Sequence, residues 1–223
     1  MNLLIAAVTP VFIVIIYIYL KDKYEKEPKR ILAYTFMLGA VVSVFITTIL
    51  YLFFDLFLPI PDEFSVLQQF IKAFFVVALI EEFSKYVVVR YYNQPKKEFN
   101  EPFDGIVYAV MVSMGFAAVE NIMYVSQGGL EVALIRAFTA IPAHATFGVL
   151  MGYYMGKAKF SKNKMKWNLI GLSIAILFHG TYDLFLFINF IPGVFIMAFI
   201  SLLLGIILSK KAIKVHQENS LFK

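Results

Sequence analysis

The sequence contains no cysteine, and only 16% of its 223 residues are charged. The absence of cysteine excludes disulfides, thiolate-bound metals and a cysteine nucleophile, although it does not identify a compartment. Soluble domains usually contain about 25% charged and about 45–50% apolar residues, whereas 61% of this chain is hydrophobic. The shortage of charge therefore predicts an integral membrane protein. We expect a single membrane domain over residues 1–223, with its core at about 66–189.

Apolar segments close to the length of about 20 residues that crosses a bilayer recur along the chain. They predict an all-α, polytopic transmembrane helix bundle of about seven spans, and no internal repeat is evident. The first segment lacks a basic start and is followed at once by cations, which favours a retained span over a signal peptide. The expected spans are 2–20, 31–58, 66–89, 103–126, 132–156, 167–189 and 191–208.

Lysine and arginine are missing from alternate loops, at 59–65, 127–131 and 189–193. The other loops and the C-terminal tail hold all of them except Lys72, Lys85 and Arg136. By the positive-inside rule, the N-terminus is expected outside and the C-terminus in the cytoplasm. Lys72 and Arg136 fall near helix ends, where a long side chain can reach the interface at low cost.

Ionisable residues nevertheless occur within four of the apolar segments. A charged side chain at the bilayer centre costs about 2.5–3.5 kcal/mol by insertion scales, so a functional use is the expected reason for keeping several of them. The residues are Glu81, Glu82 and Lys85 in one segment, and Glu120, His144, His179 and Asp183 in the others.

These polar residues are expected at similar depths in the membrane. At a rise of 1.5 Å per residue, the two adjacent glutamates and both histidines fall near the midplane. Glu120 and Asp183 fall roughly 8–9 Å further outward by the same reasoning. The coincidence predicts that four helices place their polar groups into one slab, from the midplane towards the outer half.

Spacing within the helices supports this convergence. Glu81 and Lys85 are four residues apart and share a helix face, as do His179 and Asp183. Asp183 can orient His179 and leave its second ring nitrogen free to act. Glu81 and Glu82 can both border one cavity, and one of them is expected to hold a proton because two adjacent carboxylates cannot both ionise cheaply in a low dielectric.

Small residues predict where the helices approach closely. Pro142, two residues before His144, is expected to kink its helix near the site. The small residues form two rows, Gly105, Ala109, Ser113 and Ala117 in the fourth span and Gly148, Gly152 and Gly156 in the fifth.

Several chemistries are excluded by missing motifs. No His-Glu-x-x-His or Gly-x-Ser-x-Gly occurs, which argues against a zincin-type protease and a serine hydrolase of the common type. What remains is a carboxylate base that activates water, with histidines to stabilise an oxyanion or to bind a metal. A proton-coupled transporter or channel that uses the same buried groups is the alternative. The non-functional interpretation of Glu81 and Glu82 is a structural ion pair with Lys85 and Arg136.

Four blocks in order resemble the PrsW family of bacterial intramembrane proteases, over roughly residues 15–185. That family is itself similar to the CAAX prenyl endopeptidase and bacteriocin-immunity group. Ala109 departs from the pattern where a glycine is expected, which affects packing more than chemistry. The blocks are EEFSKY from residue 81, DGIVY from 104 with GFAAVEN from 115, AHA from 143, and FHGTYD from 178.

The resemblance implies an endopeptidase of the bacterial cytoplasmic membrane that cleaves a single-span protein, an anti-sigma factor, on its extracytoplasmic side and so starts an envelope stress response. The expected partners are this substrate and the lipid bilayer, with no nucleic acid. The oligomeric state and the cleavage site do not follow from the sequence.

On this basis we assign hypothetical roles. Glu81 is the general base, and Glu82 shares its proton or binds the substrate. Glu120 supports or protonates the leaving amine, and His144 and His179 stabilise the oxyanion.

Three residues have supporting roles, Lys85, Asn121 and Asp183. In a second version of the mechanism, Glu81, His144 and His179 bind zinc and leave one position open for water. The metal-free glutamate mechanism is slightly favoured.

Overall fold

A computed structural model describes residues 2–57, 62–220 and 222–223 of the chain. All regular structure in this part of the chain is helical, as expected for an all-α protein. The α-helices are α1 (Leu3–Lys21), α2 (Lys29–Leu38), α3 (Val44–Phe57), α4 (Val66–Ile71), α5 (Leu79–Val88), α6 (Pro102–Phe138), α7 (Ala140–Lys159), α8 (Lys164–Phe187) and α9 (Ile196–Glu218). Three π-helical segments join some of them, η1 (Gly39–Ser43), η2 (Lys72–Ala78) and η3 (Val89–Asn93).

Within the described residues, five segments are long and apolar enough to cross a membrane. They are Leu3–Lys21, Lys29–Phe57, Pro102–Lys159, Lys164–Phe187 and Ile196–Glu218. The continuous helix from α4 to η3 is not among them, and it is the one that carries Glu81, Glu82 and Lys85. A multi-pass membrane protein is therefore confirmed, whereas seven spans and the orientation of the termini stay predictions.

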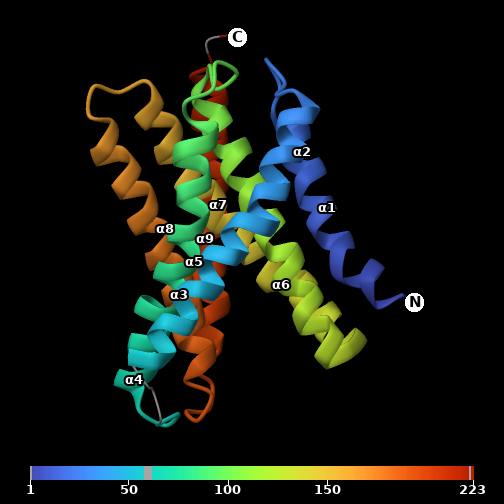
Figure 1. Cartoon of the computed structure of the whole chain (residues 1–223), viewed down its shortest axis with the longest axis vertical. Helices are drawn as coiled ribbons and strands as arrows, with labels where there is room; N and C mark the ends of the chain where they lie inside the picture. The colour runs from blue at the N-terminus through green and yellow to red at the C-terminus, as the bar shows by residue number, and fades with distance from the viewer. Residues whose placement is uncertain (1, 58–61, 221) are drawn as a thin grey trace.

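The expected fourth and fifth spans form one of these segments, and the chain reverses inside it. Gly129 has φ 69° and ψ −156°, a conformation that a residue with a side chain rarely adopts. The reversal lies in the predicted loop 127–131, near the lower end of α6 in Figure 1. A second interruption at Thr139 separates α6 from α7. It lies where Pro142 acts, because proline cannot donate a hydrogen bond to the carbonyl four residues earlier.

The two legs of this segment pack closely through the predicted rows of small residues. A Cβ atom on Gly105 would lie only 2.5 Å from the backbone oxygen of Gly152 and from the backbone nitrogen of Gly156. A Cβ atom on Gly148 would lie 2.7 Å from the hydroxyl of Ser113. The small residues therefore allow two backbones to touch, which brings α6 and α7 into register.

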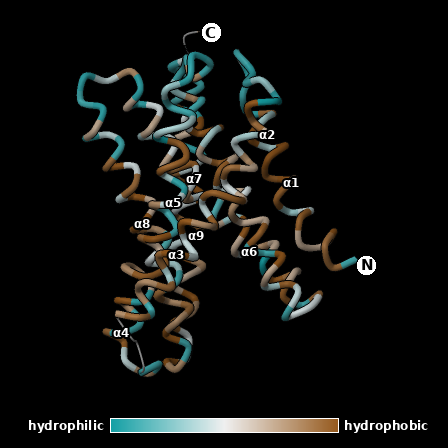
Figure 2. The backbone as a smooth tube through the Cα atoms, in the orientation of Figure 1, coloured by the Kyte–Doolittle hydropathy of each residue, from teal (hydrophilic) through white to brown (hydrophobic). Residues whose placement is uncertain are grey.

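The arrangement is open at one end. Figure 1 shows the α1–α2 turn, the α7–α8 turn and the C-terminus together at the upper end, which is also hydrophilic in Figure 2. In the lower half, the helices around α3, α4 and α9 diverge from α6. Polar residues of the buried segments line a cavity between α3, η2, α5, α6, α7 and α8, which is described next.

Candidate active site

A cavity of about 690 Å³ lies between α3, η2, α5, α6, α7 and α8. Most of its lining is apolar, and each of these six segments contributes at least one polar group. The lining includes the predicted residues Glu81, Glu120, His144, His179 and Asp183, together with Tyr51, Lys72 and Arg136. Four predicted spans thus do place their polar groups into one region.

Lys85 lies at the centre of the polar groups beneath the cavity, and its side chain is 1% exposed. Its Nζ lies 2.7 Å from Glu82 Oε1, 3.4 Å from Glu81 Oε2 and 3.3 Å from His144 Nδ1. The ammonium has three N–H donors and no acceptor, so these three partners satisfy it completely. It also lies 4.3 Å from the centre of the Phe116 ring.

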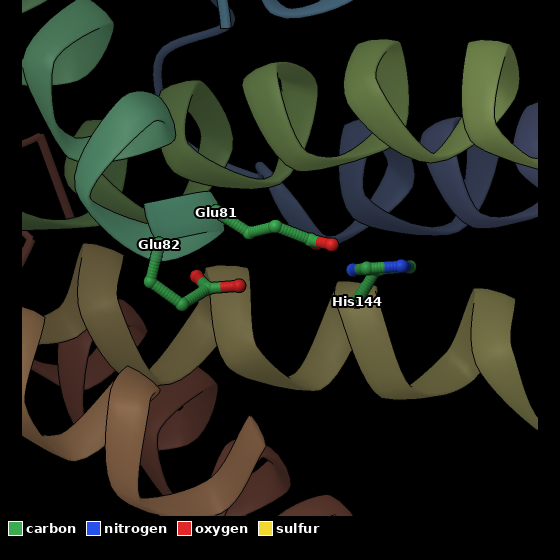
Figure 3. Close-up of side chains that lie close together, drawn as sticks. All are labelled: Glu81, Glu82 and His144. Carbon is green, nitrogen blue, oxygen red and sulfur yellow. The ribbon is translucent and has the colours of Figure 1, made fainter. Parts of the chain in front are cut away.

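The two adjacent glutamates have different surroundings. Glu81 lines the cavity, and its Oε1 accepts a hydrogen bond from the Tyr51 hydroxyl at 2.8 Å. Glu82 is 0% exposed and does not line the cavity. The expectation that both border one cavity is therefore wrong, because residues about 100° apart on a helix face different neighbours. Figure 3 shows the two carboxylates leaving α5 in different directions.

His144 connects Lys85 to an ion pair on the other side of the cavity. Its Nε2 lies 2.9 Å from Glu120 Oε2, and the same oxygen lies 2.6 Å from Arg136 Nη2. Arg136 Nε also donates to Asn121 Oδ1 at 2.7 Å, and Asn121 Nδ2 donates to the backbone oxygen of Ala7. Arg136, which was expected near a helix end, therefore also balances the charge of Glu120.

His179 lies between two carboxylates. Its Nδ1 is 2.9 Å from Glu82 Oε1, and its Nε2 is 3.2 Å from Asp183 Oδ2. The predicted contact with Asp183 is confirmed, but the expected free ring nitrogen is not found. Neutral imidazole donates from one nitrogen only, so both contacts are hydrogen bonds at once when the ring is an imidazolium. The ring stacks on Phe147 at 4.7 Å.

Two π-helical segments lie next to these residues. The segment η2 directly precedes α5 and its glutamates, and η1 packs against α5 and α6. Single π-helical turns inserted in α-helices occur frequently at functional sites. Ser43 of η1 donates to the backbone oxygen of Ser84, and the Thr47 hydroxyl bonds the Ser84 hydroxyl at 3.0 Å. These contacts attach the helix that carries Tyr51 to the helix that carries Glu81.

The donor types fit a metal ion, in a set that differs from the predicted one. One donor atom each of Glu81, Glu82 and His144 lies within 4.8 Å of the others, whereas both nitrogens of His179 face carboxylates. Glu82 Oε2 is also buried without a hydrogen-bond partner in the described part of the chain. Carboxylate and imidazole ligands suit zinc and related ions. The Lys85 ammonium competes for the same three side chains.

Three lining residues were missed as site residues, Tyr51, Lys72 and Arg136. Tyr51 lies in an apolar span where an aromatic residue attracts no notice, so no local signal identifies it. The two cations did carry a signal, because they fall inside apolar segments that otherwise hold acids. Their positions near helix ends suggested that they lie at the membrane–water interface. Only the fold shows that they also face the cavity.

Comparison with known proteins gives a consistent result. A model of the family described as PrsW family intramembrane metalloprotease matches residues 27–208. The chain is 41% identical to the curated "Protease PrsW" of Oceanobacillus iheyensis over 187 residues, which is 83% of each chain. It is 39% identical to that of Geobacillus kaustophilus over 82% of this chain and 78% of the relative, and 37% identical to that of Bacillus subtilis over 81% of each. No solved structure matches the chain significantly.

Proposed function

Since this chain belongs to the PrsW family of intramembrane metalloproteases and is a multi-pass membrane protease, we propose that it hydrolyses a peptide bond of a single-span membrane protein in the cavity around Glu81. The observation that carries this proposal is the position of the Glu81 carboxylate. It lines a cavity in an apolar bundle and lies opposite a histidine–carboxylate pair. A carboxylate in this setting can serve as a base for a water molecule that attacks a carbonyl.

Glu81 is held ready for this task by two contacts. Tyr51 donates to one of its oxygens and Lys85 approaches the other. In the proposed reaction, Glu81 takes a proton from water while the water oxygen forms a bond to the carbonyl carbon. The carbonyl π electrons move to its oxygen, and the Tyr51 hydroxyl and the cations of the cavity can stabilise the resulting oxyanion.

Collapse of the intermediate requires a proton for the leaving nitrogen. His144 and Glu120 share a short contact at 2.9 Å on the cavity wall, and Arg136 holds Glu120 from the far side. The pair can donate a proton as the C–N bond breaks, and the products are a carboxylic acid and an amine. Glu82 and Asp183 hold His179 between them, which is a positioning role for these three residues.

A metal ion, which the family description implies, would be held by Glu81, Glu82 and His144. Such an ion would supply Lewis acidity and make water easier to deprotonate. Lys85 then determines how readily a cation occupies the site, because its ammonium contacts all three side chains. The metal-free and metal-dependent versions of the reaction differ in their response to chelators that prefer transition metals.

The expected membrane topology also forms part of the proposal. Seven crossings result when the α4–η3 helix and the two legs of Pro102–Lys159 each cross once. The basic turns and the C-terminus lie together at one end (Figure 1), which supports placing that end in the cytoplasm. The cavity then lies in the outer half, and the substrate class expected from the resemblance, a single-span anti-sigma factor cut on its extracytoplasmic side, fits this geometry.

The test is co-expression with a tagged, single-span reporter of the anti-sigma type. We expect cleavage by the wild-type protein and by Glu131→Gln, a matched change of an exposed glutamate. We expect no cleavage by Glu81→Gln or by His144→Ala. Cleavage by both site variants at the wild-type rate would sink the site assignment.

Two further measurements separate the alternatives. An unchanged reporter in every case, with proton flux through the wild-type protein in liposomes, would favour the proton-coupled transporter, which the family membership does not favour. Loss of cleavage with 1,10-phenanthroline, together with one transition-metal ion per chain that is absent from Glu81→Gln, would establish the metal-dependent version.

A further inference from the structure

A second group of carboxylates lies at the other end of α6, away from the cavity. Asp22, Glu25 and Glu27 come from the α1–α2 turn, and Glu101 and Asp104 come from the start of α6. One carboxylate oxygen each of Glu25, Glu27 and Asp104 lies within 4.8 Å of the others. Asp104 precedes Glu120 by sixteen residues on α6, which is about 24 Å along the helix. These five acids, which we name the turn cluster, are therefore separate from the proposed active site.

The acids of the turn cluster form no ion pair in the part of the chain that the structure describes. Within the described residues, no salt bridge involves any of its five acids. Lys26 is the nearest candidate in sequence, but its ammonium donates to the backbone oxygens of Tyr19 and Asp22, at 2.7 and 2.8 Å. In the described part of the chain, the turn cluster thus combines several carboxylates that form no salt bridge with a protein cation.

One oxygen of each central acid has a structural role. Asp104 Oδ2 accepts from the backbone nitrogens of Asn100 and Glu101, at 2.7 and 2.8 Å, which caps the start of α6. Asp22 Oδ2 accepts from the backbone nitrogen of Glu27 at 3.2 Å. Glu27 Oε2 accepts from the hydroxyl of Tyr108. These hydrogen bonds fix the orientation of the carboxylates without using their second oxygens.

The second oxygens provide an independent sign of a ligand. Asp22 Oδ1, Glu27 Oε1, Asp104 Oδ1 and Glu25 Oε2 are all buried with no hydrogen-bond partner in the structure described. Asp22 and Asp104 are 0% exposed, and Glu27 is 2% exposed. Burying a carboxylate oxygen without a partner is costly. A cation held by Glu25, Glu27 and Asp104, whose carboxylates approach one another, would offset this cost.

Burial also keeps these groups close to titration. It raises the pKa of Glu27 to about 7 and that of Asp22 to about 6, with neighbouring acids adding to the effect.

We propose that the turn cluster binds a hard divalent cation, Mg²⁺ or Ca²⁺, through Glu25, Glu27 and Asp104, with Asp22 in support. All the donors are oxygens, and neither sulfur nor imidazole contributes, which is the preference of these ions and not of zinc or copper. The bound cation links the α1–α2 turn to the start of α6. Since α6 carries Glu120 and packs against α1, cation binding stabilises the scaffold of the cavity from its far end.

Terbium luminescence tests the proposal directly in full-length protein in detergent. Tb³⁺ takes the same oxygen ligands as Ca²⁺, and Tyr108, whose hydroxyl contacts Glu27, is placed to sensitise its emission. A Glu81→Gln/His144→Ala background removes two of the three donors of the other candidate metal site, which reduces its contribution to the signal. We expect saturable emission that Ca²⁺ or Mg²⁺ displaces.

Matched variants in the same background identify the ligands. Glu27→Gln with Asp104→Asn should weaken Tb³⁺ binding at least about tenfold, because affinity follows the number of charged ligands. Glu131→Gln should leave it unchanged, and Tyr108→Phe should lower the emission without equal loss of affinity. Equal affinity in the double variant and the background protein would overturn the proposal and indicate adventitious surface binding only.

Thermal unfolding gives a readout that does not depend on emission. Wild-type protein should unfold at a higher temperature with millimolar Mg²⁺ or Ca²⁺ than with EDTA. The Glu27→Gln/Asp104→Asn protein should lose this difference while staying monodisperse, and should be at least as stable as wild type in EDTA. A wild-type protein with no cation-dependent shift would overturn the proposal and leave the proposed protease function untouched.

Discussion

The cavity region and the turn cluster both collect buried acids, but of the two only the cavity region shows salt bridges to lysine or arginine in the described residues. In the cavity, Lys85 lies between the two adjacent glutamates, and Arg136 pairs with Glu120. In the turn cluster, four carboxylate oxygens are buried without partners. The difference shows two ways to keep acids in an apolar bundle. On the proposed roles, the acids of the cavity are held by side chains of the protein, whereas those of the turn cluster take an ion from solution.

The largest effect is expected from Glu81→Gln in the cavity. Removal of a general base typically lowers the rate by about 10²–10⁴-fold, and the change is isosteric. Reporter cleavage should fall to background while the melting temperature stays near that of wild type. The paired change Glu27→Gln in the turn cluster should reduce cleavage far less, and equal losses in the two variants would remove the functional contrast between the clusters.

Lys85→Met should cause the largest loss of stability. It leaves Glu82, which is 0% exposed, without its ammonium partner, and breaking a buried ion pair in this way costs about 3–5 kcal/mol. Thermal unfolding in detergent measures the loss.

A second change provides the control for Lys85→Met. Adding Glu82→Gln should recover part of the lost stability, because the uncompensated charge is removed along with its partner. Additive losses in the double variant would show that Lys85 acts through packing against Phe116 instead of through charge.

Tyr51→Phe should have an intermediate effect on activity. A hydrogen bond to a charged group contributes about 1.5–3 kcal/mol, so we expect cleavage to fall by roughly tenfold or more, in kcat with little change in KM. Purified protein and a fluorogenic peptide substrate give both constants. Tyr34→Phe, at an exposed tyrosine of α2, is the matched control, and a loss there of the same size would contradict a specific role for Tyr51.

The smallest effect is the pH dependence of stability in EDTA. Burial raises the pKa of Glu27 to about 7. The groups that face its carboxylate are those of Asp22, Glu25 and Asp104, together with the hydroxyl of Tyr108. At pH values between the ordinary pKa of a glutamate and the raised pKa of Glu27, the folded state binds more protons than the unfolded state. Stability therefore falls as pH rises through about 5 to 7, by a few degrees in melting temperature.

Glu27→Gln should flatten this slope, and saturating Mg²⁺ should reverse the loss at pH 7 because the cation replaces the proton. A wild-type protein whose stability rises over the same interval would contradict the assignment of a raised pKa to this group.

Much of the cavity could be predicted before the fold was known. Periodic apolar segments made the bundle clear, and Glu81, Glu120, His144 and His179 were chosen because ionisable groups are rare at membrane depth. The contacts of Lys85 with Glu81 and of His179 with Asp183 followed from helical spacing. For the cavity, helical spacing and the free-energy cost of burying ionisable groups indicate the same residues, so no information about contacts between distant segments was needed.

Other features required the tertiary arrangement. Tyr51 and Arg136 join the cavity from segments about 30 and 55 residues away from Glu81 in sequence, and their contacts depend on how helices pack. The turn cluster was missed as a site for the same reason. Asp104 lies at the start of a helix, and Glu25 and Glu27 lie in a turn almost 80 residues earlier, so only the fold brings them together.

Composition and periodicity thus specified an apolar helical bundle with costly polar groups inside its apolar segments, because both properties are carried by residues near one another in the chain. Packing alone separated Glu81, which faces the cavity, from Glu82, which is enclosed, since a rotation of about 100° on one helix meets different neighbours. It also decided which acids received a protein cation and which did not. Charge balance depends on the distances between segments, and those distances exist only in the folded chain.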